Sequence, residues 1–351
     1  MSDSLPTHRR AWRRTDDHAE GQPKLKLVTE RLPLPLAPTN ILIKVHAVAL
    51  NYRDSNIANG GNPWPVTPHG IIGNDAAGEV IAIGDKVNKL KVGDRVAPNT
   101  DTENLTGRES SRSWLAADED GVLADYLVFD QRVLARLPAT LDWVNCSILP
   151  CAGTTAWSAL KGLSIGQSLL IQGTGGVAMF ALKLAQAAGY RILLSSSSDA
   201  KVEKIQKSFP NTPIHGVNYG THPDTWHEQV LNLTDGVGVD LVLENGGTGS
   251  LVQSVLCTRR GGTVSQVGYL GKQDPMDLKD LVSTIIDRRV NIRGINAGSV
   301  NDLNDLTDAV TATNLTFDDI VENVYDFQQA EEAVQRIWEG RQIGKLVLQI
   351  T

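Results

Sequence analysis

The chain has 351 residues, of which 41% are hydrophobic and 21% are charged, which is the composition of a globular protein long enough for two domains. The formal net charge of −7 argues against a nucleic-acid partner, and no run of about 18 apolar residues could span a membrane. Three cysteines without an apolar leader argue against a secreted disulfide scaffold, so we expect a cytoplasmic protein.

The N-terminal region begins with a basic cluster, Arg9, Arg10, Arg13 and Arg14. We interpret it as a solvated stretch neutralised by the acidic residues that follow, Asp16, Asp17 and Glu20. Residues 40–54 alternate between apolar and polar side chains, and Gly-Asp turns punctuate short apolar runs within residues 76–98 and 125–138. The first 140 residues therefore predict a β-rich domain, with a polar surface loop at residues 99–120.

From about residue 167, short apolar runs alternate with longer amphipathic segments. The apolar runs predict strands at residues 167–173, 190–198, 213–219, 239–247, 263–271 and 291–298. The amphipathic segments predict helices at residues 176–189, 199–209, 221–236, 250–262 and 277–290, with Asp199 as the N-cap of the second. Continuously apolar strands separated by helices indicate a parallel sheet covered on both faces, as in doubly wound nucleotide-binding domains.

A helix over residues 327–340 and a final strand over residues 344–351 follow this block. The lone strand most simply returns to the β-rich domain, which makes that domain discontinuous. We therefore predict an α/β protein whose first domain combines residues 1–140 and 300–351. A doubly wound, parallel-sheet Rossmann domain is predicted at residues 141–299.

A glycine cluster separates the strand predicted at 167–173 from the helix that follows it. The cluster consists of Gly173, Thr174, Gly175, Gly176 and Val177, followed by the small Ala178. This is the context that the G-x-G-x-x-G/A fingerprint requires, because the first glycine permits a tight turn and the second lets a pyrophosphate approach the backbone. The helix N-terminus offers free N–H groups to the phosphates, so the cluster predicts a dinucleotide site.

The end of the next predicted strand indicates which dinucleotide to expect. An NAD site usually has an acidic side chain there, whereas this chain has four serines, Ser195 to Ser198, and then Lys201. Hydroxyl groups and an ammonium bind a 2′-phosphate that a carboxylate would repel. We therefore expect Ser196, Ser197 and Lys201 to select NADPH.

Three stretches stand out in chain order: HGIIGNDAAGEVIAIGDKVNKLKVGDRVAP from His69, LPCAGTTAWSAL from Leu149, and GTGGVA from Gly173. Together they resemble the medium-chain dehydrogenase/reductase superfamily, and LNYRDSNI from Leu50 is similar to its zinc-independent quinone oxidoreductase-like branch. The resemblance covers nearly the whole chain. It implies a GroES-like catalytic domain built from both chain ends, a Rossmann domain between them, and an active site in the cleft.

Zinc-dependent members of this superfamily have a Cys where this chain has Asn51 and a His where it has Asn74, and only Cys151 matches a ligand position. A catalytic zinc site needs three protein ligands, so one thiolate does not suffice. Residues 99–120 contain no cysteine for a structural zinc lobe. We therefore expect no metal.

Without a metal, hydrogen bonds must polarise the substrate. This suits hydride transfer from NADPH to a conjugated carbonyl such as an enone or a quinone, because the developing negative charge needs only a positioned donor. The resemblance places NYRD at the floor of the cleft. There the amide of Asn51 or the hydroxyl of Tyr52 would donate, and Asp54 would orient one of them.

The resemblance also implies further contacts. Thr155 and Gly268 would flank the nicotinamide, and Asn245 and Gly246 would lie against the ribose or adenosine. The substrate pocket would include three aromatic residues, Trp64, Trp157 and Tyr269.

Two alternatives to a quinone or enone reductase stay open. One is a zinc-independent, NADP-dependent alcohol dehydrogenase or ketone reductase, and the other is a protein that binds NADPH without catalysis. The expected partners are a small-molecule substrate and a second copy of the chain, because the resemblance implies a homodimer that pairs its edge strands at residues 291–298.

Overall fold

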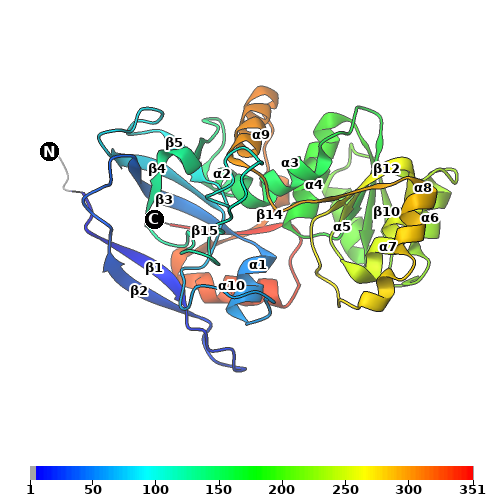
Figure 1. The fold of residues 1–351 in the computed structure, drawn as a ribbon, viewed down its shortest axis with the longest axis horizontal. Helices are drawn as coiled ribbons and strands as arrows, with labels where there is room; N and C mark the ends of the chain where they lie inside the picture. Colours follow the sequence, from blue (N-terminus) through cyan, green and yellow to red (C-terminus); the bar gives the residue numbers. More distant parts are fainter. Residues whose placement is uncertain (1–4, 351) are drawn as a thin grey trace. The chain divides into compact units, whose positions relative to one another are not determined.

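The computed structural model describes residues 5–350, which form two compact units (Figure 1). The first unit combines the chain up to Thr154 with the segment from Ala297 onward, and the second spans Thr155–Asn296. The first unit extends beyond residue 140 because α2 (Trp143–Ser147) packs against β3 (Asn40–Leu50) and β4 (Ala76–Ile83). The predicted boundaries at residues 140 and 300 therefore differ from those of the structure.

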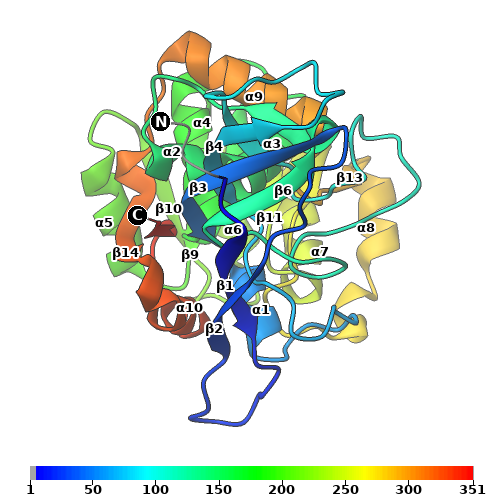
Figure 2. The same cartoon turned by 90° about the vertical axis from the view of Figure 1, so that its left-hand side faces the viewer.

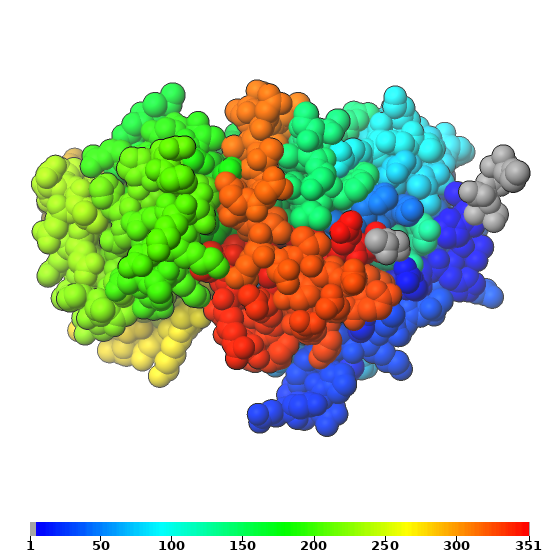
Figure 3. Space-filling view, turned by 180° about the vertical axis from the view of Figure 1, so that it is seen from behind, coloured from blue at the N-terminus to red at the C-terminus, as the bar shows by residue number. Residues whose placement is uncertain are grey.

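The first unit is built around a seven-stranded sheet in the order β14-β15-β3-β4-β5-β7, in which β6 also pairs with β3. Its other strands are β5 (Arg95–Pro98), β6 (Tyr126–Asp130), β7 (Leu134–Arg136), β14 (Val321–Asp326) and β15 (Lys345–Gln349). Its other helices are α1 (Tyr52–Ala58), η2 (Leu149–Gly153), α9 (Val300–Thr313) and α10 (Ala330–Trp338), with short 3₁₀ turns at Gln131–Val133, Asp318–Ile320 and Phe327–Gln329. Figure 3 shows the segment after residue 297, in orange and red, at the surface of this unit.

The last strand, β15, runs antiparallel to β3 and places Leu346 opposite Leu50. Residues from the two ends of the chain therefore share one core, in which Ile41, Ile43 and Leu348 are each at most 1% exposed. This pairing brings the start of β15 to the end of β3, where the NYRD stretch begins.

Strands β1 (His8–Arg14) and β2 (Leu25–Arg31) form a separate antiparallel pair, drawn in dark blue in Figure 2. The prediction of a solvated arginine stretch is wrong, because the arginines lie on β1 and are paired. The Arg14 side chain is only 1% exposed and lies 3.1 Å from Asp16. The other three arginines form ion pairs with Glu30, Asp120 or Asp125.

The second unit is a six-stranded parallel sheet in the order β10-β9-β8-β11-β12-β13. Its strands are β8 (Ser168–Gln172), β9 (Arg191–Ser196), β10 (Ile214–Asn218), β11 (Val239–Glu244), β12 (Thr258–Gln266) and β13 (Asn291–Gly294). Its helices are α3 (Thr154–Leu160), α4 (Gly176–Ala188), α5 (Asp199–Ser208), α6 (Trp226–Leu233), α7 (Thr248–Cys257), η3 (Pro275–Leu278) and α8 (Leu281–Arg288). This strand order is that of dinucleotide-binding domains, so the predicted α/β class with a Rossmann-type sheet is confirmed.

Two local predictions are wrong. Residues 258–262, predicted to end a helix, form the first part of β12, where Thr258 pairs with Val239. Asp199 does not cap α5, because the hydroxyl of Ser198 accepts the N–H of Lys201 at 3.4 Å and Asp199 is the first helical residue. Within residues 5–350, no helix is both long and apolar enough to cross a bilayer.

Candidate functional site

The glycine cluster forms the turn from β8 into α4. Gly173 has φ +82°, which favours glycine, and Gly175 is the N-cap of α4 in an extended conformation. A Cβ atom added at either glycine would meet no protein atom within 4 Å, so the backbone borders open space. The four N–H groups of the first helical turn have no partners within the helix. The turn therefore has the bare backbone and free donors that a pyrophosphate needs.

A buried carboxylate ties this turn to the end of the neighbouring strand β11. Glu244 is 0% exposed and accepts from the side chain of Gln172 at 2.7 Å and from the N–H of Gly246 at 2.7 Å. The side chain of Asn245 donates to the carbonyl of Gln172 at 2.7 Å. The predicted cofactor residues Asn245 and Gly246 are thus held beside Gly173. Sequence reasoning missed Gln172 and Glu244, whose only signal is a polar side chain at the end of an apolar strand.

The end of β12 adds one more polar group. Gln266 donates from Nε2 to the carbonyl of Gly268 at 2.5 Å, while its buried Oε1 has no hydrogen-bond partner in residues 5–350. A Cβ at Gly268 would lie 3.0 Å from the carbonyl oxygen of Asn245, so the two strand ends approach closely. Thr155, at the start of the second unit, is 5% exposed. Gln266 was also missed, and its orphaned oxygen suits an amide donor of a ligand.

The predicted phosphate-binding residues lie together at the turn from β9 into α5. Ser196 is 4% exposed, and its hydroxyl accepts the N–H of Ser198 at 3.1 Å. Ser197 is exposed, and Lys201 is half-buried in the first turn of α5. The turn therefore offers hydroxyl groups, a helix N-terminus and one ammonium, and it also contains the exposed carboxylate of Asp199.

In the first unit, Asn51 lies at the centre of a buried polar cluster. The ammonium of Lys345, at the start of β15, donates to Oδ1 of Asn51 at 2.7 Å, to the carbonyl of Leu50 at 2.9 Å and to Oδ2 of Asp75 at 3.1 Å. The side chains of Lys345 and Asp75 are 1% and 0% exposed. Sequence reasoning assigns neither residue a role in the site, yet together they form a buried ion pair beside Asn51.

The amide of Asn51 is fully engaged in this cluster. Its Nδ2 donates to Oδ1 of Asn74 at 2.9 Å and to Oδ2 of Asp75 at 3.1 Å, so both amide hydrogens have acceptors. Tyr52, the first residue of α1, is 41% exposed, and its hydroxyl makes no hydrogen bond within residues 5–350. Of these two predicted donor residues, Tyr52 is therefore the one whose hydrogen is available to a substrate.

Asp54 fixes the main chain at the same place. It is 0% exposed, its Oδ2 accepts the N–H of Asn51 at 2.8 Å, and its Oδ1 has no partner among the described residues. Burial raises the pKa of the Asp54 carboxyl to about 6, although the hydrogen bond from Asn51 and the charges of Arg53 and Lys345 favour the ionised form. The nearby Asp75 carboxylate also raises this pKa.

We expect Asp54→Asn to change how stability depends on pH. Because the folded-state pKa lies above the unfolded value, Asp54 binds its proton more tightly in the folded protein, and its contribution to stability is lost as the pH rises through about 6. The substituted amide cannot ionise but keeps an acceptor for the N–H of Asn51. Relative to wild type, the variant should gain about 1–2 kcal/mol in its free energy of unfolding between about pH 4.5 and pH 7.5, measured by urea denaturation. Parallel stability curves would show that Asp54 does not titrate in this range.

The donor atoms around Asn51 do not suit a transition metal. Burial, together with the nearby Asp75, raises the pKa of the Cys151 thiol to about 12, so the thiol keeps its proton. The Nδ2 of Asn74 lies 3.6 Å from this sulfur, and Asp75 is already paired with Lys345. In residues 5–350 no three His, Cys, Asp or Glu side chains are grouped so that they could hold a metal ion.

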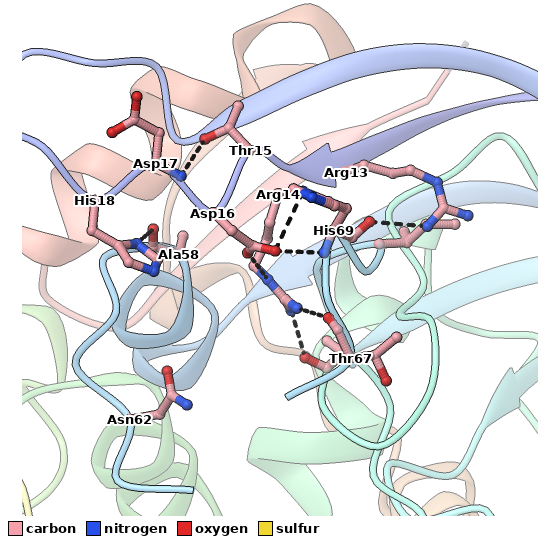
Figure 4. A network of polar contacts seen from close by, with 12 residues as sticks. Arg13, Arg14, Thr15, Asp16, Asp17, His18, Ala58, Asn62, Thr67 and His69 are labelled. Atoms are coloured by element: carbon pink, nitrogen blue, oxygen red, sulfur yellow. Dashed lines mark hydrogen bonds and ion pairs between the residues drawn. The ribbon is translucent and has the colours of Figure 1, made fainter. Parts of the chain in front are cut away.

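Two loops of the first unit carry an aromatic pair that includes the predicted pocket residue Trp64. The rings of Trp64 and Trp114 meet edge to face with centroids 6.0 Å apart. The buried Arg14 donates to the carbonyl of Thr67 in one loop (Figure 4) and to the carbonyl of Ala116 in the other. The N-terminal strand pair therefore holds both loops in place. The other predicted pocket residues, Trp157 and the half-exposed Tyr269, belong to the second unit.

Parts of the sequence match two protein families. Residues 37–139 match the alcohol dehydrogenase GroES-like domain, and residues 176–312 match the zinc-binding dehydrogenase family. A zinc-type alcohol dehydrogenase-like protein of Schizosaccharomyces pombe is 34% identical over 343 residues, which cover 95% of this chain and 97% of the relative. An L-threonine 3-dehydrogenase of Pyrococcus horikoshii is 27% identical over 345 residues, which cover 93% and 95%.

Solved structures share the fold over almost the full length. One assigned as an alcohol dehydrogenase of Sinorhizobium meliloti is 31% identical with a TM-score of 0.85, covering 99% of this chain and 100% of its own. A 2-octenoyl-CoA carboxylase reductase, solved with NADP and 2-octenoyl-CoA, has a TM-score of 0.83 at 22% identity and covers 99% and 88%.

Proposed function

Because the chain belongs to the medium-chain dehydrogenase/reductase family, we propose that it is an NADPH-dependent oxidoreductase that reduces a conjugated carbonyl, such as a quinone or an enone, without a metal. The observation that carries this proposal is the cluster around Asn51. Both amide hydrogens of Asn51 are engaged there, while the hydroxyl of the next residue, Tyr52, makes no hydrogen bond within residues 5–350. The same described residues contain no group of side chains that could hold a metal ion. A hydrogen-bond donor is enough to stabilise the negative charge that develops on a conjugated carbonyl oxygen.

The second unit would hold the cofactor. The backbone N–H groups from Gly175 onward would bind the pyrophosphate, and Ser197 and Lys201 would bind the 2′-phosphate. The orphaned Oε1 of Gln266 would accept from the nicotinamide carboxamide. When bound, NADPH supplies the hydride. Thr155, Asn245, Gly246 and Gly268 would complete the contacts.

The first unit would hold the acceptor carbonyl. Tyr52 donates to the carbonyl oxygen, while Asn51 and Asp54 fix the start of α1 and therefore the place of Tyr52. The aromatic faces of Trp64 and Trp114 suit a planar acceptor. The catalytic role is therefore assigned to Tyr52, and Asn51 and Asp54 act through it.

The relative from Schizosaccharomyces pombe is named as zinc-type and one matching family is described as zinc-binding, but the residues present in this chain do not fit a catalytic zinc ion. Two asparagines stand at the ligand positions, Cys151 is the single thiol there, and the carboxylate of Asp75 is already neutralised by the ammonium of Lys345. No step of the proposed reaction passes through a metal.

The proposal is tested by following NADPH oxidation with a panel of quinones, enones and ketones, before and after dialysis against a chelator. We expect turnover with a conjugated acceptor and the same rate after dialysis. Reduction of unconjugated ketones alone would favour an NADP-dependent alcohol dehydrogenase or ketone reductase, the activity that the named alcohol dehydrogenase relatives suggest. Tight binding of NADPH without any turnover would favour a non-catalytic role.

We also propose that two copies of the chain associate through the edge of the second sheet. The outer edge of β13 pairs with no strand in residues 5–350, and Ile292 on it is 37% exposed. On the adjacent α8, Val282 and Ile286 are 69% and 71% exposed. Pairing β13 with its copy would bury these side chains. Sedimentation should show a dimer for wild type and a monomer for the variant Ile286→Glu, and a monomeric wild type would contradict this assembly.

A further inference from the structure

A lysine that is distant in sequence controls the amide at the centre of the candidate site. Lys345 is 294 residues from Asn51 along the chain, but its Nζ lies 2.7 Å from Oδ1 of Asn51. Its three N–H donors match three oxygens, those of Leu50, Asn51 and Asp75, at 2.7–3.1 Å. This count fits the ammonium form, which has three donors and no acceptor.

Because Lys345 only donates, it determines which way the Asn51 amide faces. The oxygen of the amide must point to Lys345, and its nitrogen then points to Asn74 and Asp75, both of which accept. A flipped amide would bring an N–H group against the ammonium and an oxygen against a carboxylate. The same ammonium holds the carbonyl of Leu50, so two consecutive residues before Tyr52 are fixed by one side chain.

Asp75 completes this arrangement from a third segment of the chain. Its Oδ1 accepts the N–H of Cys151 at 2.7 Å, and its Oδ2 accepts from both Lys345 and Asn51. The Lys345–Asp75 pair therefore joins the start of β15, the end of β3 and the π-helical turn η2. A buried ion pair is a poor source of stability in itself, since desolvation offsets the attraction.

We propose that Lys345 is a positioning residue for the reaction: through Leu50 and Asn51 it sets the place of the Tyr52 hydroxyl. This inference rests on the proposed function for its effect on turnover, but the ordering of the Asn51 amide does not. Loss of the ammonium leaves Oδ1 of Asn51 without a donor and lets the amide rotate. Small displacements of a donor relative to the reacting atoms are enough to lower the rate, by about 10- to 100-fold.

The test compares Lys345→Met with the double variant Lys345→Met/Asp75→Asn in the full-length protein. The single variant leaves Asp75 buried without its counter-ion, so its melting temperature should fall. The double variant contains neither charge, and its melting temperature should return towards that of wild type. Its kcat should nevertheless stay about 10- to 100-fold low, with an unchanged KM for NADPH, because methionine cannot donate to Asn51. Wild-type kcat in the double variant would show that Lys345 only neutralises Asp75.

A matched control is Lys24→Met. Lys24 is also buried, at 8% exposure, and donates from Nζ to the carbonyls of Asp17 and Ala19, away from the cluster. This variant should lose stability without a change in kcat. An equal fall in kcat would show that the loss at Lys345 is a general consequence of removing a buried lysine.

A second readout does not depend on turnover. In protein labelled with ¹⁵N-asparagine, the side-chain signals of Asn51 are assigned by their loss in Asn51→Ser. Their hydrogen exchange should be at least about tenfold faster in the double variant than in wild type. Equal exchange rates in the double variant and wild type would overturn the positioning role of Lys345, even if no acceptor is reduced. Slow exchange of the Asn51 amide in a wild type that shows no turnover would contradict only the proposed function.

Discussion

Gly175→Ala should lower the affinity for NADPH by about 100-fold or more while leaving the fold intact, which corresponds to roughly 2.7 kcal/mol of binding free energy. The new Cβ would meet no protein atom within 4 Å, so the substitution costs the protein itself little. It would, however, stand in the space that a pyrophosphate must enter to reach the N–H groups of α4. Titration calorimetry and thermal melting of the same samples measure the two effects separately.

A glycine elsewhere in the same unit provides the control. A Cβ at Gly249, in the first turn of α7, would approach Oδ2 of Asp277 only to 3.7 Å, which is ordinary contact. Gly249→Ala should therefore leave both stability and NADPH affinity near those of wild type. If Gly175→Ala binds NADPH as tightly as this control, the cofactor does not lie against the turn between β8 and α4.

Tyr52→Phe should lower kcat by about 10²- to 10³-fold, the usual effect of removing one donor to a developing oxyanion. The melting temperature should not change, because Tyr52 is 41% exposed and its hydroxyl makes no hydrogen bond within residues 5–350. The KM for NADPH should also be unchanged, since the predicted cofactor contacts lie in the second unit. Steady-state kinetics with the best acceptor of the panel measures this.

Tyr126→Phe is the matched control. Tyr126 is a half-buried residue of β6 in the same unit, and the substitution removes the same hydroxyl. It should retain wild-type kcat. Full activity of Tyr52→Phe would contradict the donor role of Tyr52.

Elements that are marked by a pattern of neighbouring residues could be predicted from the sequence. The turn at Gly173 to Val177 is recognisable because strand, glycines and helix follow one another directly, and the same reasoning places Ser196 and Lys201 at the next strand end. The N-cap of α5 was missed by one residue, since Ser198 and Asp199 are both good N-caps and the backbone decides between them.

The buried polar groups could not be predicted, because their partners are distant in sequence. Lys345 precedes an apolar strand and gives no sign that it will meet Asn51, and Arg14 resembles a surface arginine until it bridges Thr67 and Ala116. Sequence reasoning therefore leaves the amide of Asn51 and the hydroxyl of Tyr52 as alternative donors to a substrate. In the structure, Asn51 donates its two amide hydrogens to Asn74 and Asp75, so Tyr52 is the better candidate for the donor to the substrate.

The central claim is that the second unit binds a 2′-phosphorylated nicotinamide cofactor at the turns after β8 and β9. Calorimetric titration of the wild-type protein with NADPH and with NADH tests it most directly. We expect NADPH to bind at least about tenfold more tightly, with the preference lost in Lys201→Ala. Tighter binding of NADH, or no heat with either dinucleotide, would contradict the account.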